Sequence, residues 1–372
     1  MEFIDLGAQY CALKEEIDRN IRHVLEETDF IMGKQVTEFE DRLAEYLGIQ
    51  YAVGCSSGTD ALQLIYMAYG IGEGDAVFCP DMTFVASVEP AFMLGAEPVF
   101  CDIDSHTYNI SVDSLERQIK AVAAQGKWKP RAIVAVDFIG NPADYDALNR
   151  IAKQYDLLLI EDAAQGIGAS YKGKKCGTFG DIAATSFFPS KPLGCYGDGG
   201  AVLTESEEMR DLLRSLRVHG KGSSKYDNIR IGMNARLDTI QAAVMLPKLA
   251  CLDREIERRQ ELAARYNAAL KDKFEIPFIR EGSVSSYAQY ALLAENAQHR
   301  DEIRVKLQEK GIPTIVYYPN PMHNMKVFAG CFTGDETFEN TISYADRTFS
   351  IPFSAYLTLA DQEKIIEILR LA

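Results

Sequence analysis

The stretch Leu157-Leu158-Leu159-Ile160-Glu161-Asp162-Ala163-Ala164-Gln165 joins four consecutive apolar residues to two carboxylates. A short apolar run of this kind is typical of a β-strand that is buried on both faces, and we place the strand at Leu157–Glu161. Asp162 then stands where the strand ends. Because a carboxylate at the end of a buried strand is costly unless it is paired, Asp162 needs either a cationic partner or hydrogen bonds from the local backbone.

Apolar runs of the same kind recur across the first two-thirds of the chain and alternate with helical patterns. The helical segments include Asp60–Tyr69 and Tyr145–Tyr155, and in the first of these Ala61, Leu64, Ile65 and Ala68 fall on one face. The other candidate strands are Tyr51–Cys55, Ala76–Cys79, Pro98–Asp102, Ala132–Phe138, Ile182–Phe187 and Ala201–Thr204. This alternation predicts an α/β fold with a large, mostly parallel sheet that is covered by helices on both faces.

Three polar features follow predicted strands of this sheet. Asp162 and the loop Ser56–Thr59 come directly after a strand, and Lys191 follows another strand by a short turn. Ligands of parallel sheets bind beyond the carboxyl ends of the strands. We therefore expect these three features to line one crevice.

Lys191 lies in the run Ser186-Phe187-Phe188-Pro189-Ser190-Lys191-Pro192-Leu193-Gly194-Cys195-Tyr196-Gly197-Asp198-Gly199-Gly200. No other charge occurs before Asp198, and an apolar setting lowers the pKa of a lysine and favours its free amine. An amine and a carboxylate on one crevice suit pyridoxal phosphate (PLP), because the amine forms a Schiff base with the aldehyde and the carboxylate keeps the ring nitrogen protonated. The alternative is a solvated loop lysine, which is the usual fate of this residue type.

Further residues fit the same cofactor, and each has an ordinary structural alternative. The loop Ser56–Asp60 offers a glycine and helix-start N–H groups to a phosphate, or it is only a capping turn. Gln165 either hydrogen-bonds the ring hydroxyl or begins a helix. Phe84 either stacks on the pyridine ring or packs in the core, which is the more common role of a single Phe. The hydroxyls of Ser186 and Ser190 either bind the phosphate or satisfy their own turn.

The pattern changes near Leu246, beyond which a charged helix is predicted over Lys248–Leu270 and is followed by shorter elements. We expect a large cofactor-binding domain over residues 1–245 and a smaller C-terminal α/β domain over residues 246–372. The long helix links the two domains in this interpretation.

Composition and charge argue against several other classes of protein. The 372 residues carry a net charge of −15, which disfavours non-specific binding to nucleic acid. Five histidines, none of them paired at ligand spacing, argue against zinc, so we expect no metal. No apolar run approaches the length of a membrane span, and the start of the chain is no signal peptide. Eight scattered cysteines without a C-x-x-C pair indicate a reducing compartment, so we expect a cytoplasmic protein.

With these residues in view, the chain closely resembles the DegT/DnrJ/EryC1/StrS family of nucleotide-sugar aminotransferases over nearly its whole length. An ordered set of short motifs carries the resemblance: Phe30-Ile31-Met32-Gly33, Val36-Thr37-Glu38-Phe39-Glu40, Ser57-Gly58-Thr59-Asp60-Ala61-Leu62, Glu161-Asp162-Ala163-Ala164-Gln165, the Lys191 run, Asn234-Ala235-Arg236-Leu237-Asp238 and Tyr318-Pro319-Asn320-Pro321-Met322-His323. The resemblance implies a PLP-dependent fold type I homodimer, similar to aspartate aminotransferase, with active sites at the subunit interface.

The resemblance also implies a role for each matching residue. Lys191 would be the Schiff-base lysine and Asp162 the partner of the pyridine nitrogen, with pyridoxamine phosphate as the intermediate form of the cofactor. The other implied contacts are Gln165 with the ring hydroxyl, Phe84 with the ring face, Gly58, Thr59 and Ser186 with the phosphate, Asn234 with the phosphate of the neighbouring subunit, and Arg236, Tyr318 and His323 with the substrate. A related branch of sugar dehydratases carries histidine in place of this lysine, so transamination is implied.

The Lys191 run is most similar to the branch of the family that aminates 3-keto sugars, in particular UDP-2-acetamido-3-keto-glucuronate in O-antigen and other surface-polysaccharide synthesis. Glutamate is the implied amino donor. The chain departs from many members at Tyr317-Tyr318-Pro319, where they have His-Tyr-Pro. This departure leaves the local substrate contacts, and so the exact sugar, open. The alternative within enzymes is an aminotransferase acting on a UDP- or dTDP-linked 4-keto sugar. A PLP-binding regulatory protein without catalysis is disfavoured, because such proteins usually carry an added DNA-binding domain and the chain begins directly in the family pattern.

Overall fold

The computed structural model describes residues 1–224 and 226–371. At its centre lies a seven-stranded sheet in the order β1 (Tyr51–Cys55), β9 (Gly200–Thr204), β8 (Ile182–Ser186), β5 (Leu158–Asp162), β4 (Lys129–Val136), β2 (Asp75–Pro80) and β3 (Glu97–Cys101). Every pair from β8 to β3 is parallel, whereas β9 runs antiparallel to both of its neighbours. The predicted α/β class and its mostly parallel sheet are confirmed, and each predicted strand is present.

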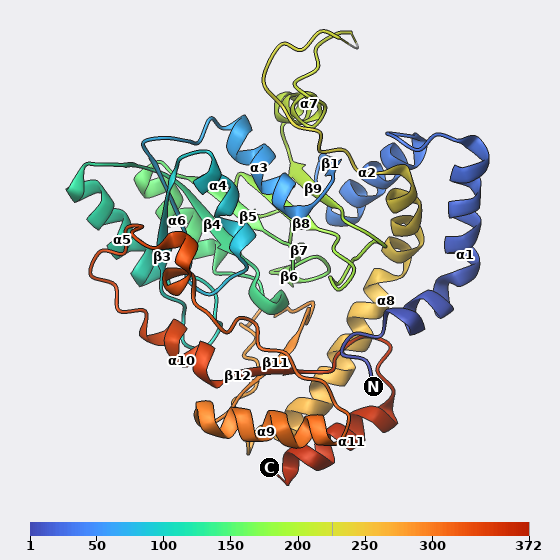
Figure 1. Cartoon of the computed structure of the whole chain (residues 1–372), viewed down its shortest axis with the longest axis vertical. Coiled ribbons are helices and arrows are strands. Elements are labelled where there is room, and N and C mark those ends of the chain that lie inside the picture. The colour runs from blue at the N-terminus through green and yellow to red at the C-terminus, as the bar shows by residue number, and fades with distance from the viewer. Residues whose placement is uncertain (225, 372) are drawn as a thin grey trace.

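Helices cover both faces of this sheet (Figure 1). They are α2 (Lys34–Leu47), α3 (Gly58–Ala68), α4 (Glu89–Met93), α5 (Val112–Gln125), α6 (Tyr145–Tyr155) and α7 (Glu207–Leu216). The first helix, α1 (Leu6–Glu27), packs instead against the long helix that follows residue 238. Successive residues of β4 show how the two faces are filled. Ile133 belongs to the apolar core shared with α5 and α6, and its neighbour Val134 belongs to the core shared with α3. Because the strands are apolar on both sides, both helical layers are needed to bury them.

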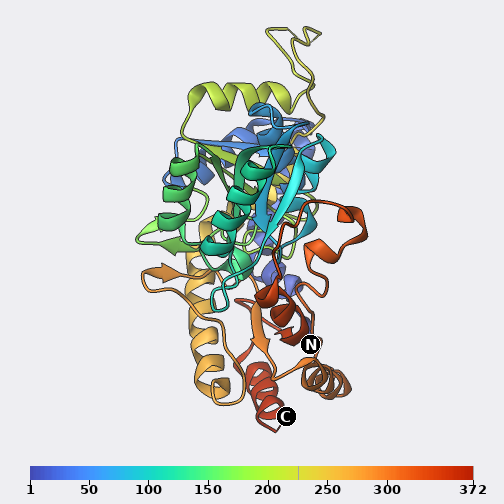
Figure 2. The ribbon, with the colours of Figure 1, turned by 90° about the vertical axis from the view of Figure 1, so that its left-hand side faces the viewer.

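A long helix, α8 (Thr239–Leu270), runs from the sheet to the C-terminal elements (Figures 1 and 2). The sequence predicted that this helix begins at Lys248, but the structure extends it nine residues earlier and keeps Pro247 inside it. Proline removes one backbone hydrogen bond from a helix interior. Here the residues before it are held by packing, since Val244 is buried against α1 and Met245 against the core shared with α2.

The C-terminal part contains its own two-stranded sheet and apolar core. Its elements are β11 (Tyr290–Leu293), β12 (Thr348–Ile351), α9 (Ala297–Glu309), α10 (Glu339–Arg347) and α11 (Leu359–Arg370), and a small sheet of β6 (Ser170–Tyr171), β7 (Lys174–Lys175) and β10 (Ser283–Val284) lies between the two parts of the chain. The boundary expected between residues 245 and 246 falls inside α8, so the division into two domains stays a prediction. Within the described ranges, no helix is long and apolar enough to span a bilayer.

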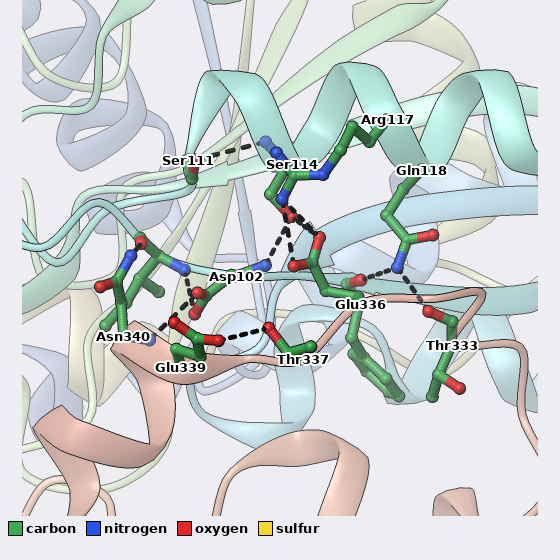
Figure 3. Close-up of polar contacts among 12 residues, drawn as sticks. Asp102, Ser111, Ser114, Arg117, Gln118, Thr333, Glu336, Thr337, Glu339 and Asn340 are labelled. Atoms are coloured by element: carbon green, nitrogen blue, oxygen red, sulfur yellow. Dashed lines mark hydrogen bonds and ion pairs between the residues drawn. The ribbon is translucent and has the colours of Figure 1, made fainter.

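A cluster of hydrogen bonds ties the C-terminal segment to the edge of the large sheet (Figure 3). Asp102, which follows the edge strand β3, accepts hydrogen bonds from the backbone N–H of Asn340 (3.1 Å) and from the N–H and hydroxyl of Thr341 (2.8 Å each). It therefore caps α10 from a distant part of the chain. Nearby, Glu336 accepts hydrogen bonds from Ser114 (2.5 Å) and Arg117 (3.0 Å).

Replacing Asp102 with alanine is expected to lower the free energy of unfolding by about 2 kcal/mol, because it leaves the first turn of α10 without its acceptor. Urea denaturation followed by circular dichroism would measure the loss. Asp335→Ala is the matched control, since Asp335 lies in the same segment with its side chain exposed. Equal stability of the two variants would show that the Asp102 cap contributes nothing.

Candidate active site

One cavity of about 450 Å³ opens at the carboxyl ends of the strands of the large sheet. Eight of the residues predicted from the sequence line it: Gly58, Thr59, Phe84, Asp162, Gln165, Ser186, Lys191 and Tyr318. They come from the ends of β5 and β8, from the start of α3, and from loops before and after these elements. The expectation that the Asp162, Lys191 and Ser56–Thr59 features share one crevice is therefore confirmed.

Asp162 ends β5 and is buried. Each of its carboxylate oxygens accepts one hydrogen bond, Oδ2 from the Ser87 hydroxyl at 2.7 Å and Oδ1 from the Ala164 backbone N–H at 3.1 Å. Burial raises the pKa of the Asp162 carboxyl, while these two hydrogen bonds and the nearby charge of Lys191 act in the opposite direction. The carboxylate keeps lone pairs free on its cavity side, so it can bind a cationic N–H there.

Lys191 lies in the turn after β8, five residues beyond Ser186. Burial lowers the pKa of its amine, and the charge of Asp162 opposes that shift. Among the residues that line the cavity, Lys191 carries the one amine. A lysine amine that faces a largely apolar cavity with a lowered pKa is a nucleophile and a base, rather than a solvated surface charge.

The start of α3 forms the phosphate-sized end of the cavity. Ser57 caps the helix by accepting a hydrogen bond from the Asp60 N–H (3.0 Å). The N–H groups of Gly58 and Thr59 belong to the first turn and have no acceptor within the helix. A Cβ atom on Gly58 would lie 2.6 Å from the Cβ atom of Ser186, so only glycine allows this approach. The free N–H groups and the helix dipole favour an anion at this position.

The opposite wall of the cavity holds the aromatic residues. Phe84 lines the cavity and is 53% exposed, and its ring lies 6.0 Å, centroid to centroid, from the ring of Tyr318. Gln165 accepts a hydrogen bond from the Ile139 N–H (2.5 Å) and donates one to the Tyr318 hydroxyl (3.3 Å). Burial raises the pKa of Tyr318, so its hydroxyl stays protonated and can also donate.

Three predicted residues are not in the cavity lining. Asn234 is exposed in the segment between α7 and α8, where it pairs with Val218, and Arg236 lines a separate groove beside the same segment. His323 lies behind the cavity wall, where its Nδ1 is 2.6 Å from Oδ2 of the buried Asp81 and its ring stacks on Phe338. The phosphate and substrate contacts assigned to these three residues stay predictions.

Several lining residues were not predicted from the sequence. Ser87 and Thr83 follow β2, and Gln289 and Tyr317 come from the C-terminal half of the chain. The buried Oε1 of Gln289 has no hydrogen-bond partner among the described residues, so this oxygen can accept a hydrogen bond from a ligand. No periodicity in the sequence marks these positions; the only signal was the pair of hydroxyl residues Thr83 and Ser87 shortly after a predicted strand.

A buried acidic pair lies at the ends of the neighbouring strands β4 and β5. Asp137 and Glu161 are both fully buried, and together with Cys176 their polar atoms lie within 4.8 Å of one another. Glu161 accepts backbone hydrogen bonds from Gly177 (2.6 Å) and Phe179 (2.7 Å), so its oxygens are engaged by the chain itself. Burial raises the pKa of Asp137 to about 6, and burial together with the Asp137 charge raises the pKa of Glu161.

This pair predicts a pH dependence of stability. A carboxyl whose pKa is raised in the folded state stabilises the fold below its unfolded pKa, near 3.8, and loses that stability as the pH rises through about 6. Asp137→Asn removes this titration with little change in the shape of the side chain. From pH 4 to pH 7 the variant should gain on the order of 2–3 kcal/mol relative to the wild type.

Chemical denaturation at several pH values would measure this gain. Asp346→Asn is the control, because Asp346 is exposed in α10. A constant difference in unfolding free energy between Asp137→Asn and the wild type across this range would contradict the raised pKa of Asp137 in the folded state.

These features together satisfy the requirements of a pyridoxal phosphate site. The cavity has an anion-binding end at Gly58, an amine at Lys191, a buried carboxylate at Asp162 and an exposed aromatic face at Phe84. Each of these groups has the chemical character that one part of the cofactor requires: phosphate, aldehyde, ring nitrogen and ring face.

Comparison with known proteins gives a consistent result. The sequence profile of the DegT/DnrJ/EryC1/StrS aminotransferase family matches residues 12–370. The chain is 43% identical over 363 residues to the UDP-2-acetamido-2-deoxy-3-oxo-D-glucuronate aminotransferase of Pseudomonas aeruginosa, with 97% of each chain covered.

Solved structures are similar over the whole chain. An aminotransferase of this family from Brucella abortus superposes with a TM-score of 0.97 at 46% identity, covering 100% of this chain and 98% of the other. NtdA of Bacillus subtilis, solved with its cofactor pyridoxamine phosphate bound, superposes with a TM-score of 0.87 at 29% identity, covering 96% of this chain and 81% of the other.

Proposed function

Because the chain belongs to the DegT/DnrJ/EryC1/StrS aminotransferase family, we propose that it moves an amino group from glutamate to carbon 3 of a nucleotide-linked keto-sugar. The sugar that we propose is UDP-2-acetamido-3-keto-glucuronate or a close analogue. The observation that carries the proposal is the placement of Lys191 and Asp162 on one cavity with an anion-binding end. The cofactor is pyridoxal phosphate, on the fold type I scaffold of this family.

When bound, pyridoxal phosphate supplies an aldehyde and a ring that accepts electrons. Lys191 provides the amine that holds the aldehyde, and burial lowers the pKa of this amine, which favours its unprotonated form. The same amine would act as the general acid-base that moves a proton at the alpha carbon of the amino donor. Asp162 holds the proton on the ring nitrogen, where its negative charge balances the positive charge of the protonated ring.

The other lining residues orient the reactants. The N–H groups of Gly58 and Thr59, with the Ser186 hydroxyl, bind the phosphate, and Phe84 covers one face of the ring. Gln165 fixes the hydroxyl of Tyr318 through their hydrogen bond, which leaves the tyrosine hydrogen able to reach a ring or sugar oxygen. Gln165 also lines the cavity, and its amide would hold the ring hydroxyl of the cofactor.

A homodimer would complete the site. Asn234 and Arg236 lie outside the cavity, in the segment between α7 and α8 that projects from the body at the top of Figure 1. The same segment exposes Ile229 (57%) and Ile231 (86%), and such exposed apolar side chains are typical of a contact surface. We propose that this segment of each subunit reaches the cavity of its partner, bringing Asn234 to the phosphate and Arg236 to the anionic substrate.

The position of the new amine tests the substrate assignment. The holoenzyme would be incubated with ¹⁵N-glutamate and, in separate reactions, with a UDP-linked 3-keto uronate or with UDP- and dTDP-linked 4-keto sugars. NMR would locate the carbon that acquires ¹⁵N. We expect labelling at carbon 3. Labelling at carbon 4 alone would establish the alternative, a 4-keto-sugar aminotransferase, and labelling of no sugar would contradict the proposed function.

We also propose that the reaction takes place in the cytoplasm and serves surface-polysaccharide synthesis. All eight cysteines are free thiols in the structure, which suits a reducing compartment. An amino sugar linked to a nucleotide is a donor for glycosyl transfer, so the product has the chemistry that a polysaccharide pathway consumes.

A further inference from the structure

The carboxylate of Asp162 depends on a side chain that is 75 positions away in the sequence. The hydroxyl of Ser87 lies 2.7 Å from Oδ2 of Asp162 and is the one side-chain group that hydrogen-bonds this carboxylate within the described residues. Ser87 ends the short helix Val85–Ser87, and only 1% of its surface is exposed. Its hydroxyl therefore has no access to bulk water as an alternative partner.

A second hydroxyl, that of Thr83, hydrogen-bonds to the hydroxyl of Ser87. The Oγ1 atom of Thr83 lies 2.8 Å from the Oγ atom of Ser87, and geometry alone allows either atom to donate. An ionised carboxylate only accepts hydrogen bonds, so Ser87 must donate to Asp162. Because a hydroxyl has a single hydrogen, Thr83 must then donate to Ser87. The three side chains form one directed series, from Thr83 to Ser87 to Asp162.

The backbone keeps this series in place. The carbonyl of Ser87 accepts a hydrogen bond from the buried hydroxyl of Tyr66 (2.7 Å), and the Ser87 N–H donates to the carbonyl of Phe84 (3.0 Å). The hydroxyl thus has a fixed position, and Phe84, on the same short loop, is fixed with it. Hydrogen bonds from fixed donors to a buried charge are stronger than those from mobile donors, since no reorganisation is needed.

Asp162 needs such donors. Its burial favours the protonated carboxylic acid, which cannot balance a protonated ring nitrogen. The hydrogen bond from Ser87 is the largest of the contributions that oppose this effect. Two hydroxyls in series stabilise the ionised carboxylate more than the Ser87 hydroxyl would alone, because Thr83 polarises the Ser87 O–H bond that points at the carboxylate.

We propose that Ser87, supported by Thr83, is a positioning residue that keeps Asp162 ionised and directed at the pyridine nitrogen. This inference rests on the proposed function, and it assigns a role to two residues that touch neither the amine nor the aldehyde. It concerns the charge state of Asp162, which is measurable in the full chain without cofactor.

The test compares Ser87→Ala and Thr83→Val with the wild type, since each variant removes a hydroxyl with little change of shape. Infrared spectroscopy of the cofactor-free full chain would follow the protonation of Asp162, identified as the carboxylic acid band that is missing in Asp162→Asn. We expect the midpoint of this titration to rise by about one pH unit in Ser87→Ala, and by less in Thr83→Val. The affinity for pyridoxal phosphate should fall roughly tenfold in Ser87→Ala, with kcat reduced more than the KM for the sugar is changed.

Ser206→Ala is the control, because Ser206 caps α7 far from the cavity and should leave the Asp162 midpoint unchanged. An unchanged midpoint in Ser87→Ala would overturn the proposal, and an unchanged midpoint in Thr83→Val alone would remove Thr83 from it. A merely structural role for the two hydroxyls would lower stability without moving the midpoint. If both midpoints shift but no keto-sugar is aminated, the proposed function fails and the control of Asp162 by Ser87 stands.

Discussion

Replacing Lys191 with alanine is expected to lower transaminase turnover by roughly 10⁴-fold or more, to the limit of detection. The variant loses the one amine on the cavity lining, which is the group that we propose to hold the cofactor's aldehyde and to move the proton. The visible absorbance of the bound cofactor should change as well, because the aldehyde no longer has a lysine partner. Steady-state assays with glutamate and a keto-sugar, together with absorbance spectra, measure both effects.

Two comparisons separate loss of chemistry from loss of fold. Lys153→Ala removes an exposed amine from the last turn of α6 and should retain full activity. Circular dichroism and thermal unfolding of Lys191→Ala should match the wild type without cofactor, since burial of an unpaired amine stabilises nothing. Full turnover by a correctly folded Lys191→Ala variant would refute the assignment of this residue.

Replacing Asp162 with asparagine is expected to lower kcat/KM by roughly 10²- to 10³-fold for both the glutamate and the keto-sugar half-reactions. The amide has nearly the same shape and still accepts the Ser87 hydrogen bond through its oxygen. It carries no charge, so it cannot hold a proton on the ring nitrogen, and the ring becomes a weaker electron acceptor. Single-turnover measurements of each half-reaction would show the loss directly.

Asp181→Asn is the matched control for this variant. Asp181 lies just before β8, at the opposite edge of the sheet from the cavity, where its carboxylate accepts the Leu159 N–H at 2.8 Å. This substitution removes the same charge and keeps the same shape, but it should leave both half-reactions unchanged. A similar loss of activity in both variants would mean that charge at Asp162 has no specific role at the ring.

The large sheet was predictable because its strands are short apolar runs that end at Gly, Pro, Asp or Ser. Tyr51–Cys55 was placed without error, and Leu157–Glu161 was displaced by one residue. The residues that directly follow these strands, Asp162 and the loop at Gly58, were therefore assigned to the right edge of the sheet. Parallel strands present their carboxyl ends together, so a one-dimensional pattern sufficed for this part of the site.

Contacts between distant segments were beyond the reach of local patterns. The pairing of Ser87 with Asp162 spans 75 positions and that of His323 with Asp81 spans 242, and neither leaves a period in the sequence. The start of α8 was missed for a related reason. Local propensity disfavours Pro247 in a helix, but packing against α1 and α2 overrides it, and that packing is visible only in three dimensions.

The roles of Asn234 and Arg236 could not be predicted from the sequence pattern either. Local sequence gives no reason for two polar residues outside the cavity to act within it, and only the family resemblance suggested a contribution from a second subunit. The structure of one chain places both beside a projecting segment. Their predicted contacts therefore depend on the second subunit of the proposed homodimer.

The central claim, that Lys191 holds pyridoxal phosphate, is tested most directly by chemical trapping. Sodium borohydride treatment of the purified holoenzyme would fix the cofactor to whichever lysine carries it, and mass spectrometry of a proteolytic digest would identify that residue. We expect a pyridoxyl group on the peptide containing Lys191 and on no other. A label on a different lysine, such as the buried Lys248, or no label on any peptide of a protein that binds the cofactor, would contradict the account.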